Sequence, residues 1–343
     1  MKRTLLATAA LALAMVAAIA GYATWGWKLL HEAQGPRTRV SYTVVPGQSA
    51  GQILDRLSAL GLLPDATLAR LYLVYYLDDP PLQAGEYSFP SPATTPEVLD
   101  RMVRGKVVEH PVTLIEGQTL QETAQHLAAE GFGDYETFLA LMRSPASIID
   151  LDPEATTLEG YLFPDTYHFP RSATEVRIVD TLVDTFRRHL ETDLGTDYDG
   201  SLRDLVILAS IVEKEAQLDS ERPIIAGIYS NRLERGIGLY ADPTIIFALK
   251  QLGRWDGDIR RRDLALDSPY NTYLYPGLPP GPICSAGLAS LRAAAAPADV
   301  PYLYFVSRND GSHVFARTLR EHNRNVDEWQ RRYWRQRRAE GSK

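Results

Sequence analysis

Cysteine is almost absent from this chain, which has one, Cys284, among its 343 residues. A single thiol excludes an internal disulfide and any metal site built from several thiolates. The seven histidines show no H-E-x-x-H or comparable spacing, so a metallohydrolase is not expected. The sequence therefore predicts a protein that uses neither a metal ion nor another cofactor.

An excess of positive charge is also lacking. The 36 basic and 43 acidic residues give a formal charge of −7, which argues against nucleic acid as the main ligand. A neutral or mixed-charge substrate fits this balance better. With 45% hydrophobic residues, the chain is long enough to form two or three domains.

A long apolar run lies near the N-terminus. Residues 5–22 are almost all Ala, Leu, Met, Val and Ile, with Lys2 and Arg3 before them and two tryptophans soon after. About 20 apolar residues cover the hydrocarbon core, basic residues favour a cytoplasmic N-terminus, and aromatic residues suit the far interface. The alternative is a cleaved signal peptide, because residues 18–20 resemble a cleavage site, but the run is long for one. We predict a transmembrane anchor over residues 1–27, and both interpretations export the rest.

An internal repeat follows a polar linker at residues 28–39. Two segments match when Gly47-Gln48-Ser49 is aligned with Gly117-Gln118-Thr119, 70 residues further on. Each copy predicts a strand, a glycine turn, a helix that begins at Ser or Thr, and a glycine stop. Such units resemble LysM modules, which bind N-acetylglucosamine-containing glycans, although a packing unit without a ligand fits the same pattern. We assign residues 40–145 to LysM-like α+β modules.

The segment SLRDLVILASIVEKEA, residues 201–216, predicts a helix that begins at Ser201 with an S-x-x-D cap. Its aliphatic residues share one broad arc at 100° per residue, and Glu215 lies inside that arc. Glu213 lies at the margin of the arc, so we expect most of its carboxyl to point away from the interior. Lys214, Ser210 and Arg203 point the other way.

Burial of Glu215 against aliphatic side chains predicts a chemical role. Desolvation raises the pKa of a carboxyl toward the value of roughly 6 to 7 that suits a general acid. A structural ion pair with a buried Arg or Lys is the alternative. A Ser-Lys hydrolase is a further one, because Ser210 and Lys214 are four residues apart, but both lie on the polar arc and no K-T-G partner is present.

Aromatic and amide residues further along the chain suit the wall of a sugar-binding cleft, where flat rings stack and polar groups form hydrogen bonds. They come from the extended segment LEGYLFPDTYHFP, from a helix at residues 221–235, and from a Pro- and Gly-rich loop at residues 267–283. A packed loop without a ligand fits the same composition. The candidates are Glu159, Tyr161, Asn231, Tyr270, Asn271 and Tyr273.

Five segments, in order behind the apolar run, carry a family resemblance: LEGYLFPDTY, LASIVEKEA, SNRLERGIGLYADPT, SPYNTYLYPGLPPGPI and PYLYFVSRNDGSHVFARTLREHN. The chain resembles the endolytic murein transglycosylase family, also called MltG or YceG-like, over nearly its whole length. In that family the catalytic acid is the second glutamate of the E-K-E triplet, which is Glu215 here. One departure is the CSAG of residues 284–287, where relatives commonly have an Asn-Pro-Gly or Thr-Pro-Gly turn; this leaves the loop conformation open.

The resemblance implies cleavage of the β-1,4 bond between N-acetylmuramic acid and N-acetylglucosamine in nascent peptidoglycan, with a 1,6-anhydro end as product. Glu215 would act first as acid and then as base toward the muramyl C6 hydroxyl, so no nucleophilic carboxylate is required. The implied partners are peptidoglycan strands and penicillin-binding synthases. A non-catalytic peptidoglycan-binding scaffold for these synthases is the alternative.

The expected architecture is therefore α+β. A transmembrane helix and small LysM-like modules precede a mixed α+β catalytic domain over residues 146–343, which the resemblance gives a lysozyme-like helical core. The expected location is the inner membrane, with a single span, a cytoplasmic N-terminus and the bulk of the chain in the periplasm.

Overall fold

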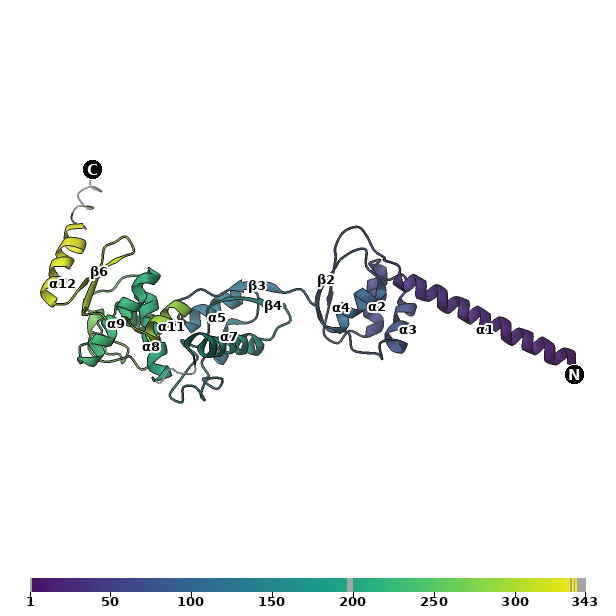
Figure 1. The fold of residues 1–343 in the computed structure, drawn as a ribbon, viewed down its shortest axis with the longest axis horizontal. Helices are drawn as coiled ribbons and strands as arrows, with labels where there is room; N and C mark the ends of the chain where they lie inside the picture. The colour runs from purple at the N-terminus through teal and green to yellow at the C-terminus, as the bar shows by residue number, and fades with distance from the viewer. Residues whose placement is uncertain (1, 196–199, 334, 336, 338–343) are drawn as a thin grey trace. The chain divides into compact units, whose positions relative to one another are not determined.

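The computed structural model describes residues 2–195, 200–333, 335 and 337. It contains both helices and strands, which confirms the predicted α+β class (Figure 1). The chain forms two compact units. Unit 1 consists of Met1–Pro111 and His168–Ala173, and unit 2 consists of Val112–Tyr167 and Thr174–Lys343.

Unit 1 is a small α+β module that follows a long helix. Its elements are α1 (Lys2–His31), β1 (Val40–Val44), α2 (Ala50–Ala59), α3 (Ala66–Tyr75), β2 (Gly85–Phe89) and α4 (Thr95–Val103). Strands β1 and β2 pair antiparallel, from Val40 opposite Phe89 to Val44 opposite Gly85. The helices cover a buried aliphatic and aromatic core against this sheet, to which Leu57, Leu73 and Tyr87 contribute fully buried side chains.

Helix α1 carries the apolar run and extends beyond the predicted residues 1–27. In the part of the chain that the structure describes, one helix is long and apolar enough to cross a membrane, over Leu6–His31. The C-terminal end of α1 belongs to unit 1, because Leu30 is buried in that unit's core. The predicted linker therefore begins inside a helix, and it ends at β1.

Both copies of the predicted repeat form the same local structure. Gly47 and Gly117 turn the chain with φ of 88° and 79°, a backbone conformation that favours glycine. Ser49 and Thr119 then begin their helices with complete capping boxes, which satisfy two backbone N–H groups at each helix start. Gly61 ends the first helix, with φ of 75°, and Gly131 ends the second in the same way.

The two copies belong to different units. The second copy lies in unit 2, with α5 (Leu120–Ala129) and α6 (Tyr135–Met142), so the expected boundary at residues 145 and 146 falls inside that unit. Helix α6 packs against both α5 and α7, and the Met142 carbonyl accepts a hydrogen bond of 2.8 Å from the Leu158 N–H. These contacts tie the second copy to the chain that follows it.

Unit 2 contains the remaining helices and a β-hairpin, and the division between the units falls within the two strands of a further sheet. The helices are α7 (Glu175–His189), α8 (Leu202–Glu215), α9 (Arg222–Glu234), α10 (Asp242–Gln251), α11 (Leu288–Ala295) and α12 (Leu319–Val326). Short helical segments are η1 (Leu190–Leu194) and η4 (Asp327–Arg332), which are π-helices, and η2 (Asp219–Glu221) and η3 (Asp263–Ala265), which are 3-10 helices. The strands are β5 (Tyr304–Ser307) and β6 (His313–Ala316), which form an antiparallel hairpin. A further two-stranded sheet is formed by β3 (His110–Thr113) and β4 (Thr166–Phe169).

Helix α8 is the central element of unit 2 and corresponds to the predicted helix. Ser201 caps it by accepting a hydrogen bond from the Asp204 N–H, as the S-x-x-D pattern predicts. The helix packs against α9, α10 and α11, and every residue from Leu205 to Val212 is buried. Because α8 is buried on all sides at these positions, it has no solvent-exposed polar face there.

Candidate active site

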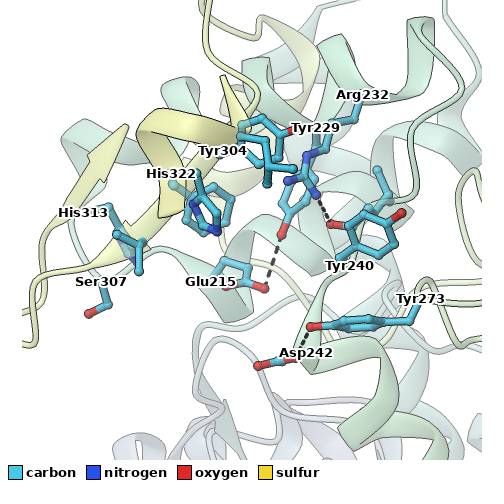
Figure 2. A pocket seen from close by; sticks show the side chains of 14 residues that line it. Glu215, Tyr229, Arg232, Tyr240, Asp242, Tyr273, Tyr304, Ser307, His313 and His322 are labelled. Carbon is cyan, nitrogen blue, oxygen red and sulfur yellow. Dashed lines mark hydrogen bonds between the residues drawn. The ribbon is translucent and has the colours of Figure 1, made fainter. Parts of the chain in front are cut away.

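A cavity of about 450 Å³ opens at the C-terminal end of α8, within unit 2 (Figure 2). Helices α8, α9, α10 and α12, the hairpin β5–β6 and one residue of the Pro-rich loop contribute to its wall. Its polar lining residues are Glu215, Tyr229, Arg232, Tyr240, Asp242, Tyr273, Tyr304, Ser307, His313 and His322. Aromatic rings therefore alternate with charged groups around the cavity, which suits a ligand with both C–H faces and hydroxyl groups.

Glu215 is the last residue of α8, and its half-buried side chain lines this cavity. Burial raises the pKa of its carboxyl to about 7, and the negative charge of Asp242 acts in the same direction. A hydrogen bond of 3.2 Å from the Tyr229 hydroxyl to Oε1 and the positive charge of Arg232 act against this rise. Among the described residues, Glu215 has no ion-pair partner, so its carboxyl is able to gain and lose a proton near neutral pH.

Asp242 is a second carboxyl on the same cavity. It is the first residue of α10, and its side chain is exposed. The Tyr273 hydroxyl donates a hydrogen bond of 2.6 Å to Asp242 Oδ1 (Figure 2). Burial and this hydrogen bond raise the pKa of Tyr273, so the phenol remains a donor. Asp242 and Glu215 therefore place an exposed carboxyl beside a desolvated one, which is an arrangement found where two carboxyls of one site have different roles.

Arg232 supplies a positive charge to the opposite part of the wall. Its guanidinium donates hydrogen bonds to the carbonyls of Leu303 and Leu239, at 2.7 and 2.6 Å, and lies over the rings of Tyr240 and Tyr304. Only 6% of the residue is exposed, and burial lowers the pKa of the guanidinium. No acidic side chain among the described residues forms an ion pair with it, so its charge acts on the cavity and on Glu215.

Two histidines complete the cavity, and sequence reasoning did not select them. His313 on β6 is held by the Glu221 carboxylate, which lies 2.7 Å from Nδ1 and accepts a 3.0 Å hydrogen bond from the His313 backbone N–H. His322 on α12 stacks on Tyr304, with ring centroids 5.2 Å apart. Both belong to the segment PYLYFVSRNDGSHVFARTLREHN, so the motif that carried the resemblance also contained the signal for these residues.

Glu213 lies two residues before Glu215 on α8 and has a different environment. Its side chain is 7% exposed, and its Oε1 lies 3.1 Å from Nη1 of the buried Arg222. Its Oε2 accepts a hydrogen bond of 3.0 Å from the Gly287 N–H. The prediction that most of this carboxyl points away from the interior is therefore wrong. Because neighbouring helices surround this end of α8, both carboxyls are enclosed, and their partners distinguish them.

Ser210 also differs from the prediction. We expected it on a polar arc, but it is completely buried. Its hydroxyl donates to the Ile207 carbonyl and accepts from the Ile283 N–H, and the Cys284 thiol donates to the Ser210 carbonyl. Lys214 instead donates to the Gly117 carbonyl. The described hydrogen bonds therefore contain no Ser-Lys pair, and the segment that departs from the family pattern is a buried packing segment.

Of the predicted cleft-wall residues, only Tyr273 lines the Glu215 cavity. Asn231 donates to the carbonyls of Val300 and Tyr302, at 2.7 and 3.1 Å, and so ties α9 to the chain before β5. Asn271 is completely buried and donates to the carbonyls of Leu264 and Leu266. Both amides satisfy backbone groups rather than face the cavity, as the alternative of a packed loop expects.

The remaining three candidates lie elsewhere in unit 2. Both Glu159 oxygens accept hydrogen bonds from the Leu120 N–H at the start of α5, and burial raises the pKa of this carboxyl to about 8. The buried Tyr161 donates a hydrogen bond of 2.6 Å to Asp152. Tyr270 packs its ring against Phe247. Membership of a family motif therefore does not distinguish residues that line the Glu215 cavity from residues that pack elsewhere.

Known proteins similar to this chain share one description. An endolytic murein transglycosylase of Bacillus subtilis (strain 168) is 30% identical over 330 residues, covering 89% of this chain and 89% of the relative. One of Streptococcus pneumoniae is 30% identical over 323 residues, covering 84% of this chain and 58% of that longer protein.

A solved structure and a family model agree with these relatives. The crystal structure of a yceG-like protein from Listeria monocytogenes matches with a TM-score of 0.58 and 31% identity, covering 84% of this chain and 99% of that one. The model of the YceG-like family matches residues 42–328, which include both copies of the repeat and every residue of the cavity. This chain therefore belongs to the YceG-like family.

Proposed function

We propose that this chain is a membrane-anchored endolytic peptidoglycan lytic transglycosylase. It cleaves the β-1,4 bond between N-acetylmuramic acid and N-acetylglucosamine and leaves a 1,6-anhydro end, which terminates a nascent strand. The observation that carries the proposal is Glu215, a carboxyl with a pKa of about 7 at the wall of an open cavity. The name shared by the relatives, endolytic murein transglycosylase, supports the substrate class.

The first step is proton donation by Glu215. The protonated carboxyl donates to the bridging oxygen, the bond from that oxygen to C1 of the muramyl sugar breaks, and N-acetylglucosamine leaves with a new hydroxyl group. The Tyr229 hydroxyl holds Oε1, which leaves Oε2 to carry the proton toward the cavity. Burial keeps the pKa of Tyr229 well above its ordinary value, so this hydroxyl stays a donor throughout.

The second step returns the proton to Glu215. The muramyl C6 hydroxyl attacks C1 of the same sugar and gives its proton to the Glu215 carboxylate, which restores the acid. A nucleophile within the same sugar has a high effective molarity, so neither water nor a nucleophilic carboxylate is needed. Arg232 and Tyr229 favour the carboxylate form, whereas burial and Asp242 favour the acid form. This balance suits a group that uses both forms in one cycle.

Asp242 takes the electrostatic role in this mechanism. Positive charge develops at C1 while the glycosidic bond breaks, and a fixed negative charge on the same cavity stabilises it. The hydrogen bond from Tyr273 restricts the Asp242 carboxylate to one orientation. Two carboxyls therefore share the reaction, with Glu215 transferring the proton and Asp242 acting through its charge.

The remaining features of the proposal concern location and partners. Helix α1 supports a single-pass anchor in the inner membrane, with a cytoplasmic N-terminus and the bulk of the chain in the periplasm. The two LysM-like copies would hold glycan strands, and α8 with the helices around it would form a lysozyme-like core. The protein partners that the family likeness implies are glycan-polymerising penicillin-binding synthases, which would supply nascent strands.

The test is Glu215→Gln, which keeps the size of the side chain and removes the proton cycle. Mass spectrometry measures the release of anhydro-muropeptides from purified sacculi. We expect this release to fall about 10²- to 10⁴-fold. Glu234→Gln makes the same change at an exposed position near the end of α9, and it should leave release unchanged. Release at the wild-type rate by a folded Glu215→Gln variant would contradict the proposal. Wild-type protein that binds sacculi but makes no anhydro ends would favour a non-catalytic scaffold.

A further inference from the structure

Helix α3 carries an exposed aromatic stripe that the proposed activity does not use. Leu68, Leu71, Tyr72, Tyr75 and Tyr76 are spaced i, i+3, i+4, i+7 and i+8, which places them on one helical face. Leu68 and Tyr72 are buried, but Tyr75 is 80% exposed, Tyr76 59% and Leu71 44%. The stripe contains no charged residue, so water is a poor environment for its exposed half.

The stripe packs against the C-terminal end of α1. Trp27 lies 6.1 Å from Tyr72 and 5.3 Å from Tyr76, measured between ring centroids, and Tyr72 stacks on Tyr76 at 4.7 Å. A Cβ added to the buried Gly26 would come within 3.3 Å of Leu68, so the two helices are in close contact here. These contacts fix the height of α3 along α1.

That height corresponds to a membrane surface. A hydrocarbon core of about 30 Å takes about 20 residues of helix at 1.5 Å each, so a span that begins at Leu6 leaves the core near Trp25. Trp27 is two residues further on, in the interfacial layer where Trp and Tyr side chains concentrate. Tyr76 is in ring contact with Trp27, and the exposed part of the stripe continues from it.

Other surfaces of unit 1 have the opposite character. The exposed side chains on α2 include Gln52, Asp55 and Arg56, all of which are polar. Beside the stripe, Arg70 pairs with Asp79 at 2.7 Å, and both are exposed, which marks the return to water. Among the described residues of unit 1 beyond α1, the large apolar side chains that are exposed are therefore gathered on the α3 stripe, apart from Val45 after β1.

We propose that the α3 stripe lies in the interfacial layer of the bilayer, with Leu71, Tyr75 and Tyr76 among the lipid headgroups. Tyrosine suits this layer because its ring is apolar and its hydroxyl is polar. Unit 1 is then held against the membrane by two contacts, α1 and α3, and cannot rotate freely about α1. This inference rests on the membrane anchor of the proposed function, but not on its chemistry.

The test uses spin labels on the full-length protein in phosphatidylcholine–phosphatidylglycerol nanodiscs. Cys284, which is buried and outside the cavity, is replaced with Ala, and single cysteines are introduced by Leu71→Cys, Tyr75→Cys, Asp55→Cys and Met15→Cys. For each label we compare its accessibility to oxygen with its accessibility to a water-soluble nickel chelate. We expect the ratio of the first to the second to be several-fold higher at positions 71 and 75 than at position 55. Position 15, on the exposed apolar part of α1, reports the anchor itself.

The outcomes separate the possible occupants of the stripe. Equal ratios at positions 55, 71 and 75 would show the stripe in water and overturn the inference. Protection of positions 71 and 75 from both reagents would show a protein cover, such as a second copy of this chain, and would also overturn it. A water-like ratio at position 15 would instead contradict the proposed anchor, whereas a lipid-like ratio there leaves the α3 result to decide this inference alone.

Discussion

The last turn of α8 places two carboxyl groups in different regions of unit 2. On one side, Glu213 pairs with the buried Arg222 and accepts the Gly287 N–H. On the other, Glu215 faces a cavity and receives one hydrogen bond, from Tyr229. Burial is common to both, so burial alone does not distinguish the two carboxyls. The difference is that Glu213 forms an ion pair with the permanent cation Arg222, whereas Glu215 has no such partner among the described residues.

The largest expected effect on stability is at Glu213. Glu213→Gln leaves the Arg222 guanidinium buried without its full counter-charge, and breaking a buried pair in this way typically costs about 3–5 kcal/mol. We expect a clearly lower midpoint of thermal unfolding, measured by calorimetry, with the pH dependence of the residual activity unchanged. A stable Glu213→Gln variant with a shifted pH profile would instead place Glu213 in the proton cycle.

A third carboxyl, Glu159, also has a raised pKa, but it does not line the Glu215 cavity. Its pKa of about 8 lies above the ordinary value of 4.5, so the folded state holds the proton more tightly than the unfolded state. Its contribution to stability is then fully present below about pH 4.5 and is lost as pH rises toward 8. Glu159→Gln removes this loss. The unfolding midpoint of the variant minus that of the wild type should therefore become more positive between pH 5 and pH 8.5. A constant difference would contradict the raised pKa.

Asp242 sharpens the comparison from the cavity side. Wild-type release should decline as pH rises through about 7, because Glu215 must begin the cycle protonated. Asp242→Asn removes a charge that raises this pKa, so the alkaline limb should move to lower pH, and kcat should fall about tenfold, or about 1.4 kcal/mol. Tyr273→Phe keeps the charge and serves as the control, with the position of the limb retained. An unmoved limb in Asp242→Asn would remove its electrostatic role.

The smallest expected effect is at Tyr229. Tyr229→Phe removes a hydrogen bond that lowers the pKa of Glu215, so the alkaline limb should move to higher pH, opposite to the shift for Asp242→Asn. A single hydrogen bond contributes about 0.5–1.5 kcal/mol, which corresponds to a change of a few-fold to about tenfold in kcat/KM. Shifts in the same direction for both variants would mean that their effects reach Glu215 by another route.

Local features were predictable because they depend on neighbours in the chain. The capping residues Ser49, Thr119 and Ser201 begin their helices as expected, since each satisfies backbone groups three residues away. The glycine turns of the repeat follow for the same reason. Periodicity also predicted that the Glu215 carboxyl is enclosed, as it is in the structure, and the family motif selected the same residue.

Predictions failed where distant segments decide a side chain's surroundings. Ser210 is polar and lies opposite the aliphatic arc, yet α8 is covered on all sides, so its hydroxyl is buried against the backbone of Ile283. His313 and His322 come from the last 35 residues and reach the cavity only because a hairpin and α12 fold over the end of α8. Asn231 and Asn271 have side chains suited to sugars, but nearby backbone carbonyls occupy their donors.

The sequence by itself determined the apolar helix, the repeated units and the place of Glu215 on α8, because helical periodicity and capping act over a few residues. Only the tertiary structure decided which of the two enclosed carboxyls has a cationic partner among the described residues. The surroundings of the two depend on Arg222, Tyr229 and Asp242, which other parts of the chain bring to the end of one helix. Charges and hydrogen bonds act through space, so the pKa of Glu215 depends on the folded surroundings, which the motif alone does not specify.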